Sequence, residues 1–179
     1  MSQTWNIDPS HTSVTFAVKH MVIATVRGSL KLTSGTAQMG DDGKLLGVEA
    51  VIDATTINTA DAGRDGHLNS LEFLDTANHT ALTFKSTGVQ ALGGNGYKVT
   101  GDLTIRGTTN PIILDVETTP AGKDPWGNTR MAATATGKLS RKEWGLVWNQ
   151  TLETGGLLVS DEVKLTLDVQ AVQPTPVAT

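Results

Sequence analysis

The chain has 179 residues, enough for one domain with a substantial core, and a composition of 38% hydrophobic and 18% charged residues excludes a disordered chain. Its net charge of −4 at pH 7 gives no reason to expect a nucleic-acid partner or a basic membrane-surface patch. The chain has no cysteine, so disulfides and thiol chemistry are excluded.

The N-terminal residues show no basic region followed by an apolar run, so no secretory signal is recognised. No apolar run approaches the ~18–20 residues of a membrane-spanning helix. We therefore expect no stable membrane insertion and a cytoplasmic location, with a periplasmic location as the alternative if a signal was removed. Residues 173–179 contain prolines and are expected to form a flexible tail behind a single domain, residues 1–172.

Apolar and polar residues alternate along most of the chain, which is the pattern of strands with one dry face and one wet face. In the first clear run, Val14, Phe16 and Val18 share one face. Roughly eight such runs are found, at residues 13–20, 26–38, 46–54, 81–89, 98–107, 111–119, 130–140 and 162–172. Turn signals separate them at residues 41–43, 93–96 and 106–108. The sequence therefore predicts an all-β fold, with antiparallel strands that close into a barrel.

Several inward positions of these runs carry small residues, namely Ala50, Gly101, Ala133, Ala135 and Gly137. A barrel of about eight strands has an interior that side chains can just fill, or that can hold one small ligand. The small residues favour a cavity. The alternative is that aromatic side chains from elsewhere occupy the space they leave, and both interpretations stay open at this point.

One segment, residues 64–75, breaks the alternation and is expected to form a short helix inserted between two strands. Thr59 or Asp61 is placed to cap a helix that begins near Ala62. Its leucines recur every third residue and are expected to cover the barrel mouth: Leu68, Leu71 and Leu74. Gly63 and Gly66 weaken the helix by roughly 1 kcal/mol each, so we expect a lid that loosens without ligand.

The same segment raises an alternative, an acid–base cluster of Arg64, Asp65 and His67. Asp65 and His67 would not share a helix face. We therefore favour a structural role, in which Arg64 or Asp65 fixes the helix to a loop and His67 donates to a backbone carbonyl. A small hydrolase or isomerase acting on a lipid, with His67 or His20 as the base, is the alternative.

No other motif points to chemistry. The histidines are scattered and have no cysteine nearby, so no metal site is expected. Phosphate-loop, dinucleotide-binding and nucleophile-elbow patterns are missing, so we predict no cofactor and no enzymatic activity. Trp144 and Trp148 lie four residues apart, as an aromatic pair that lines a pocket or plugs a barrel end.

Several runs in fixed order resemble the YceI-like family, the bacterial lipocalin-like polyisoprenoid-binding proteins. They span residues 5 to about 172 and read WNIDPSHTSVTFAVKHM, VRG, RDGHLNSLEFLD, LTFKST, GDLTIRGTTNPI and RKEWGLVWN. The resemblance implies an eight-stranded antiparallel lipocalin-like barrel with a short helical insert between strands, often dimeric. It implies an isoprenoid lipid ligand, of polyprenyl phosphate or isoprenoid quinone type, held in an apolar tunnel and carried or stored there. Fatty acyl-type amphiphiles are the alternative cargo.

With such a ligand, the hydrocarbon tail of the lipid needs only apolar walls, and a phosphate head group would contact Arg64, His67 and Arg141 at the mouth. The residues expected to contact the ligand are Phe16, Val18, Met21, Arg64, His67, Leu68, Leu71, Phe73, Leu82, Phe84, Leu103, Ile105, Leu114, Met131, Ala133, Ala135, Arg141, Trp144, Trp148, Leu165 and Leu167.

Overall fold

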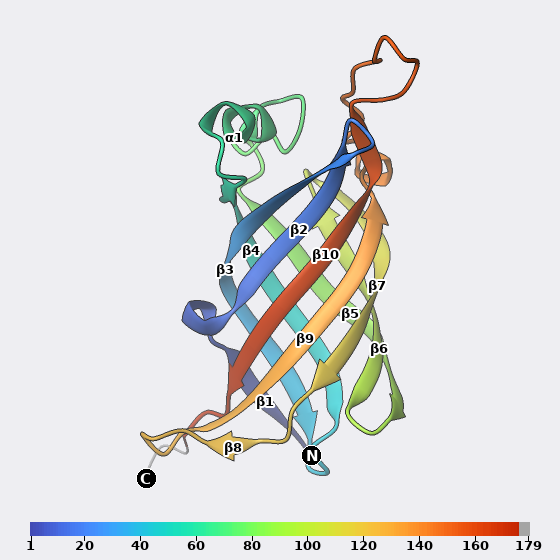
Figure 1. Cartoon of the computed structure of the whole chain (residues 1–179). Helices are drawn as coiled ribbons and strands as arrows, with labels where there is room; N and C mark the ends of the chain where they lie inside the picture. Colours follow the sequence, from blue (N-terminus) through green and yellow to red (C-terminus); the bar gives the residue numbers. More distant parts are fainter. Residues whose placement is uncertain (176–179) are drawn as a thin grey trace.

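The computed structural model describes residues 1–175 and shows one long antiparallel sheet that closes on itself (Figure 1). Eight strands form the ring in the order β10-β2-β3-β4-β5-β6-β7-β9, and β9 pairs back to β10. Their bounds are β2 Ser13–His20, β3 Ala24–Gly40, β4 Leu45–Asn58, β5 Ala81–Gly93, β6 Gly96–Ile105, β7 Thr108–Thr118, β9 Thr129–Ser140 and β10 Val159–Val172. The predicted all-β, eight-stranded antiparallel barrel is confirmed.

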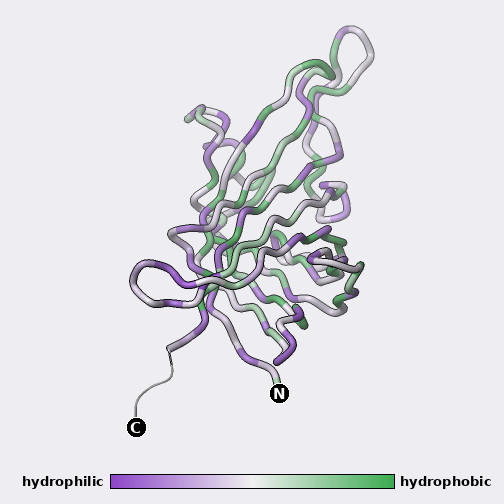
Figure 2. The backbone as a smooth tube through the Cα atoms, turned by 60° about the horizontal axis from the view of Figure 1, so that its bottom comes forward, coloured by the Kyte–Doolittle hydropathy of each residue, from purple (hydrophilic) through white to green (hydrophobic). Residues whose placement is uncertain are grey.

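The alternation along each strand decides which side chains fill the barrel. Figure 2 shows hydrophobic and hydrophilic residues alternating along the strands. Phe16 pairs with Leu165, which pairs in turn with Gly137, so inward positions of neighbouring strands lie in one row. The predicted turns also form: Arg106 and Gly107 have φ of 49° and 73° and join β6 to β7 in a two-residue loop.

Two short strands were not predicted, β1 (Ser2–Ile7) and β8 (Gly122–Lys123). β1 pairs with the lower half of β3 and the last residues of β10, whereas β2 pairs with the upper half of β3. The two therefore occupy one position in the ring, interrupted by the short 3-10 helix η1 (Pro9–His11).

An ion network holds this interruption in place. The Asp8 carboxylate caps η1 at the Ser10 amide and accepts from Arg130 Nη1 at 2.9 Å, while Arg130 Nε donates to Asp124 at 2.7 Å. Hydrogen bonds from Ser10, Arg130 and His11 hold the pKa of Asp8 well below its usual range. The hydrogen bond from Arg130 is the main cause that lowers the pKa of Asp124. The network thus connects the start of the chain to β9.

The predicted helical insert is α1 (Ala62–Asn69), which lies between β4 and β5 at the upper end of the barrel in Figure 1. Asp61, one of the two predicted caps, accepts from the Arg64 amide at 2.8 Å. The helix ends at Asn69 because the Ser70 amide and hydroxyl both donate to the His67 carbonyl. Continuous helical spacing therefore stops before Leu71.

Three large side chains pack at the lower end of the barrel. Trp5, Met39 and Tyr97 are all at least nine-tenths buried there, and they line a second pocket of about 360 Å³ together with part of the Asp41–Gly43 turn. No helix among residues 1–175 is long and apolar enough to cross a membrane. The predicted flexible tail covers residues 173–179, of which 176–179 lie outside the described residues.

Candidate functional site

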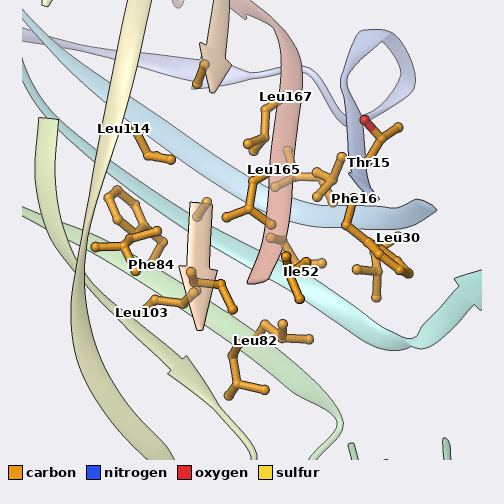
Figure 3. A pocket seen from close by; sticks show the side chains of 18 of the residues that line it. Thr15, Phe16, Leu30, Ile52, Leu82, Phe84, Leu103, Leu114, Leu165 and Leu167 are labelled. Carbon is orange, nitrogen blue, oxygen red and sulfur yellow. The ribbon is translucent and has the colours of Figure 1, made fainter. Parts of the chain in front are cut away.

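A continuous cavity of about 610 Å³ occupies the interior of the barrel, and Met39 at the lower end belongs to its lining. Figure 3 shows side chains from different strands converging on it, among them Phe16, Ile52, Leu82, Leu114 and Leu165. All eight ring strands contribute to the wall, and α1 with the segment before β10 completes it at the mouth. The lining is almost entirely apolar, so the cavity favours a hydrocarbon over any polar solute.

The small inward residues have two different roles. A Cβ added to Gly28 would lie 2.3 Å from Phe16 Cζ, and one added to Gly101 would lie 2.3 Å from Phe84 Cζ. These glycines therefore make room for phenylalanine rings. The alanines at inward positions instead face the open space: Ala50, Ala133 and Ala135. Both predicted explanations of the small residues therefore apply: the glycines leave space for aromatic rings, and the alanines border the cavity.

Most residues proposed from the sequence are brought together on this wall. The structure places the following on the cavity lining: Phe16, Val18, Arg64, His67, Leu68, Phe73, Leu82, Phe84, Leu103, Ile105, Leu114, Met131, Ala133, Ala135, Arg141, Trp148, Leu165 and Leu167. Most of them come from strands far apart in the sequence, and the others from α1, the 3-10 helix η2 (Arg141–Trp144) and the irregular segments at the mouth. Closure of the sheet brings them within one space.

Three proposed residues lie outside the lining. Met21 is in the β2–β3 turn, beyond the inward His20, and 47% of its surface is exposed. Leu71 follows the end of α1 and is 68% exposed, so the predicted leucine stripe is wrong at this position. Trp144 is buried in the wall, where its indole donates to the Leu103 carbonyl at 2.9 Å.

The predicted pairing of Trp144 with Trp148 fails for a local reason. The 3-10 helix η2 covers only Arg141–Trp144, and Gly145 then turns with φ of 76°. Spacing of four residues therefore does not place the two indoles on one face. Trp144 plugs the wall, and only Trp148 reaches the mouth.

Arg64 and Asp65 attach α1 to the end of β4. Arg64 donates from Nε to the Thr59 hydroxyl at 2.8 Å and from Nη2 to the Thr59 carbonyl at 3.0 Å. Asp65 accepts from the Thr59 amide at 2.8 Å. This confirms the predicted structural role of the pair. Arg64 has no ion pair with a carboxylate of residues 1–175, and it belongs to the lining of the cavity.

His67 sits at the centre of an aromatic cluster at the mouth. Its ring packs edge-on against Phe73 and Trp148, with centroids 4.9 Å and 4.5 Å away. Nε2 lies 2.5 Å from a Glu72 carboxylate oxygen, rather than on the backbone carbonyl that we predicted. The cluster thus joins α1 to the segment before β10 across the mouth.

Arg141 is 3% exposed and organises the other side of the mouth. It donates to the carbonyls of Leu146, Trp148, Val159 and Ser160 at 2.6–3.3 Å. Burial of the guanidinium lowers its pKa from the usual value, and the Asp161 carboxylate, 3.8 Å from Nη2, opposes this shift. With its donors used by carbonyls, Arg141 positions the loop and adds positive potential, but has little left for direct contact with a head group.

Sequence reasoning missed several lining residues. His20, Val26 and Leu30 were available from the alternation of residues 13–30, since they continue the inward rows of β2 and β3. Ile57 and Thr59 lie past a register shift in β4, which no alternation pattern reveals.

Another cluster with catalytic residue types is Asp8, Ser10 and His11, on the outer surface. Ser10 Oγ and Asp8 Oδ2 both lie beside the same His11 nitrogen, Nδ1, at 3.2 Å and 2.8 Å. A nucleophile–base–acid triad needs the hydroxyl and the carboxylate on opposite ring nitrogens. This cluster is therefore a cap for η1.

Comparisons with known proteins agree with this architecture. The YceI-like domain family matches residues 5–171. A UPF0312 protein of Staphylococcus aureus (strain N315) is 35% identical over 163 residues, which cover 89% of this chain and 92% of that protein.

Solved structures share the fold at lower identity. BcnA of Burkholderia cenocepacia has a TM-score of 0.78 at 20% identity, over 92% of this chain and 98% of that one. A Campylobacter jejuni YceI protein has a TM-score of 0.72 at 24% identity, over 88% and 90%. A polyisoprenoid binding domain from Saccharophagus degradans has a TM-score of 0.65 at 15% identity, over 95% and 98%. With its family match across nearly the whole barrel, the chain belongs to the YceI-like family.

Proposed function

We propose that the protein binds a long-chain isoprenoid lipid, of polyprenyl phosphate or isoprenoid quinone type, in the barrel cavity and acts as its carrier or store. The observation that carries the proposal is the apolar cavity of about 610 Å³, open at the end where α1 lies. A related fold is described as a polyisoprenoid binding domain in Saccharophagus degradans, which supports this cargo class over fatty acyl amphiphiles.

The cavity size limits how much of the lipid can be enclosed. At about 30 Å³ per water-sized group, 610 Å³ has room for on the order of 20 carbon atoms, or about four isoprene units. Burial of a hydrocarbon contributes roughly 0.8 kcal/mol per CH₂. The enclosed part therefore offers enough free energy for tight binding after the costs of ordering. Longer tails would fold back or leave part of their length outside.

The head group has a different environment. Arg64 and His67 belong to the cavity lining at the mouth, where the bound lipid would leave the apolar wall. An anionic head group there would accept from the Arg64 guanidinium, which has no carboxylate partner among residues 1–175. Arg141 supports the site at longer range. The mouth thus favours a phosphate or a polarised quinone oxygen over a cation.

The direct test is mass spectrometry of the organic extract of the protein purified from its native host. We expect a polyprenyl compound in near-stoichiometric amount. The Ala135→Phe variant, purified in parallel, is the control for lipid that adheres outside the barrel. No extractable isoprenoid, together with no uptake of added polyprenyl phosphate by the emptied protein, would contradict the proposal.

Subcellular fractionation of the same host distinguishes the predicted cytoplasmic location from a periplasmic one, and sedimentation analysis tests the predicted homodimer.

An enzyme acting on a lipid is the second candidate, favoured by one observation. The His67–Glu72 pair at 2.5 Å is a base with an orienting carboxylate at the cavity mouth. A hydroxyl of Ser or Thr beside Nδ1 is not seen among residues 1–175, so the pair would need water as the nucleophile. If wild-type protein converts a bound polyprenyl phosphate and His67→Gln abolishes this conversion while binding persists, the protein is an enzyme rather than a carrier.

A further inference from the structure

The turn between β2 and β3 exposes three consecutive apolar residues at the open end of the barrel. Met21, Val22 and Ile23 are 47%, 72% and 85% exposed. The turn rises at the same end of the barrel as α1 (Figure 1). The Met21 amide donates to the Leu158 carbonyl at 2.8 Å, so the turn lies against the segment before β10, where Leu157 is also half-exposed. We call Met21, Val22, Ile23 and Leu157 the apolar tip.

The backbone of this turn is poorly suited to its residues. Met21 and Val22 have φ of 53° and 66°, in the left-handed region where a β-branched residue such as Val is unfavourable. At the same end, the β6–β7 turn has the same pair of left-handed residues but uses Arg106 and Gly107. Folding alone would favour Asn and Gly at such positions. Exposed apolar side chains on so strained a turn point to a role outside folding.

Basic residues lie in a row across the outer face just below the tip. Strand register aligns Lys138, Lys164 and Arg27 on β9, β10 and β3, and Lys19 lies one step nearer the tip on β2. All four are exposed, because their neighbours Leu139, Leu165, Val18 and Val26 belong to the inward rows. We call these four residues the basic row.

Ion pairs with carboxylates leave most of the charge of the basic row unneutralised. Lys138 is 3.9 Å from Glu162, and no carboxylate of residues 1–175 pairs with the other three. Asp161, the other acid nearby, pairs with Lys142 at 3.1 Å. Such an excess of cations stands out on a chain with net charge −4.

The spacing of tip and row fits the surface of a bilayer. Lys19 is two residues from Met21 and Arg27 is four from Ile23, or roughly 7 Å and 13 Å at about 3.3 Å per residue. An apolar segment buried ~5–10 Å into the head-group region would bring cations at this distance to the level of the phosphates. Apolar and charged groups therefore match the two layers that they would meet.

We propose that the apolar tip and the basic row together dock the open end of the barrel onto an anionic lipid bilayer. A second copy of the chain fits less well, because four partly exposed side chains of roughly 100 Å² each offer far less than the ~800 Å² per partner of a stable interface. Docking gives a carrier a route for its cargo, but the surface binds whether or not the cavity is filled. Experiments can therefore contradict membrane docking without contradicting lipid binding in the cavity, and the reverse.

Vesicle flotation tests the docking surface with the emptied protein. We expect binding to phosphatidylcholine vesicles that contain phosphatidylglycerol, weaker binding to phosphatidylcholine alone, and loss of binding as salt is added. Arg27→Gln with Lys164→Gln should weaken binding about fivefold per charge. Lys98→Gln, an exposed lysine near the other end of the barrel, should leave it unchanged.

The Val22→Gly and Ile23→Ser double variant separates docking from folding. Glycine relieves the strained turn, so the melting temperature should hold or rise, while vesicle binding falls about tenfold or more. Uptake of polyprenyl phosphate from dilute detergent should stay at the wild-type level. The proposal is overturned if wild-type protein ignores phosphatidylglycerol vesicles or if the double variant binds them like wild type. It is also overturned if the variant turns a dimer into a monomer without any change in vesicle binding.

Discussion

At the scale of single residues, the cavity depends on which small side chains face open space. Gly28 and Gly101 are covered by the rings of Phe16 and Phe84, whereas Ala135 lines the cavity. A glycine under a ring stabilises packing, and an alanine on the open wall sets the volume for cargo. Substitutions at the two kinds of position should therefore have different consequences.

Ala135→Phe should abolish lipid uptake with little loss of stability. The ring extends into a space of about 610 Å³ instead of into packed atoms, so the 1–3 kcal/mol cost of overpacking is avoided. Titration with a fluorescent polyprenyl analogue and thermal unfolding provide the two measurements. Thr136→Phe places the same ring on the outward neighbour and should bind normally. A large drop in the melting temperature of Ala135→Phe would show a filled interior.

Arg130→Met should change how stability responds to acid. Asp8 and Asp124 have pKa values held below the usual range, with Arg130 as the main cause for Asp124 and a contributing one for Asp8. Their contribution is present above the unfolded pKa of about 3.9 and is lost as pH falls through the lower folded values. The variant should be less stable at neutral pH and lose less stability on acidification.

Urea unfolding of this variant at neutral pH and below about pH 4 measures the effect. Lys98→Met removes the same charge from an exposed site and should leave the pH dependence as in the wild type. Parallel pH profiles for wild type and Arg130→Met would mean that the network contributes nothing to acid sensitivity.

At the scale of elements, α1 is held by its ends more than by its own sequence. The Asp61 cap, the Thr59 bonds and the His67 cluster fix it, while Gly63 and Gly66 weaken the helix itself. None of its residues is fully buried. An element with few buried contacts opens at lower free energy than the barrel strands, which suits a wall that must admit cargo.

Amide hydrogen exchange should show this difference directly. With polyprenyl phosphate bound, exchange over residues 62–74 should slow, because cargo contacts with Leu68 and Leu74 oppose opening. The amides of β6, whose alternate residues are buried in the core, serve as an internal reference. Equal protection of α1 with and without ligand would remove the lid from the mechanism.

Gly66→Ala should slow the release of cargo. A Cβ at Gly66 meets nothing within 4 Å, so the change stabilises the helix by about 1 kcal/mol without a clash. Stopped-flow transfer of a fluorescent polyprenyl lipid to acceptor vesicles measures the rate. Gly88→Ala, equally unobstructed but on β5 away from the mouth, is the matched control. A rate unchanged by Gly66→Ala would place the slow step elsewhere.

Regular strands were predictable from the sequence, while irregular segments were not. Ser13–His20 was predicted with its observed bounds because alternation there is unbroken. In β3 the register shifts between Leu32 and Ser34, which lets both Leu32 and Ala37 point inward although they are five positions apart, an odd number. No alternating pattern can anticipate such a bulge. The mouth was predicted worst, because Leu71 and Trp144 depend on where short helices end.

At the scale of the whole molecule, the size of the cavity should set a limit to affinity. Binding should strengthen with each isoprene unit up to about four and then level off, because the ~20 enclosed carbons use the available space. Calorimetry across a series of polyprenyl phosphates of increasing length tests this. Affinity that keeps rising well beyond that length would require a second apolar surface outside the barrel.

The large side chains buried at the lower end, Trp5, Met39 and Tyr97, have a consequence for kinetics. If cargo enters and leaves only at the end where α1 lies, an incoming molecule cannot push out the resident one. Departure must precede arrival. The rate at which cargo exchanges is then set by the dissociation rate of the bound lipid and does not depend on the concentration of free lipid. Each protein molecule carries one lipid at a time.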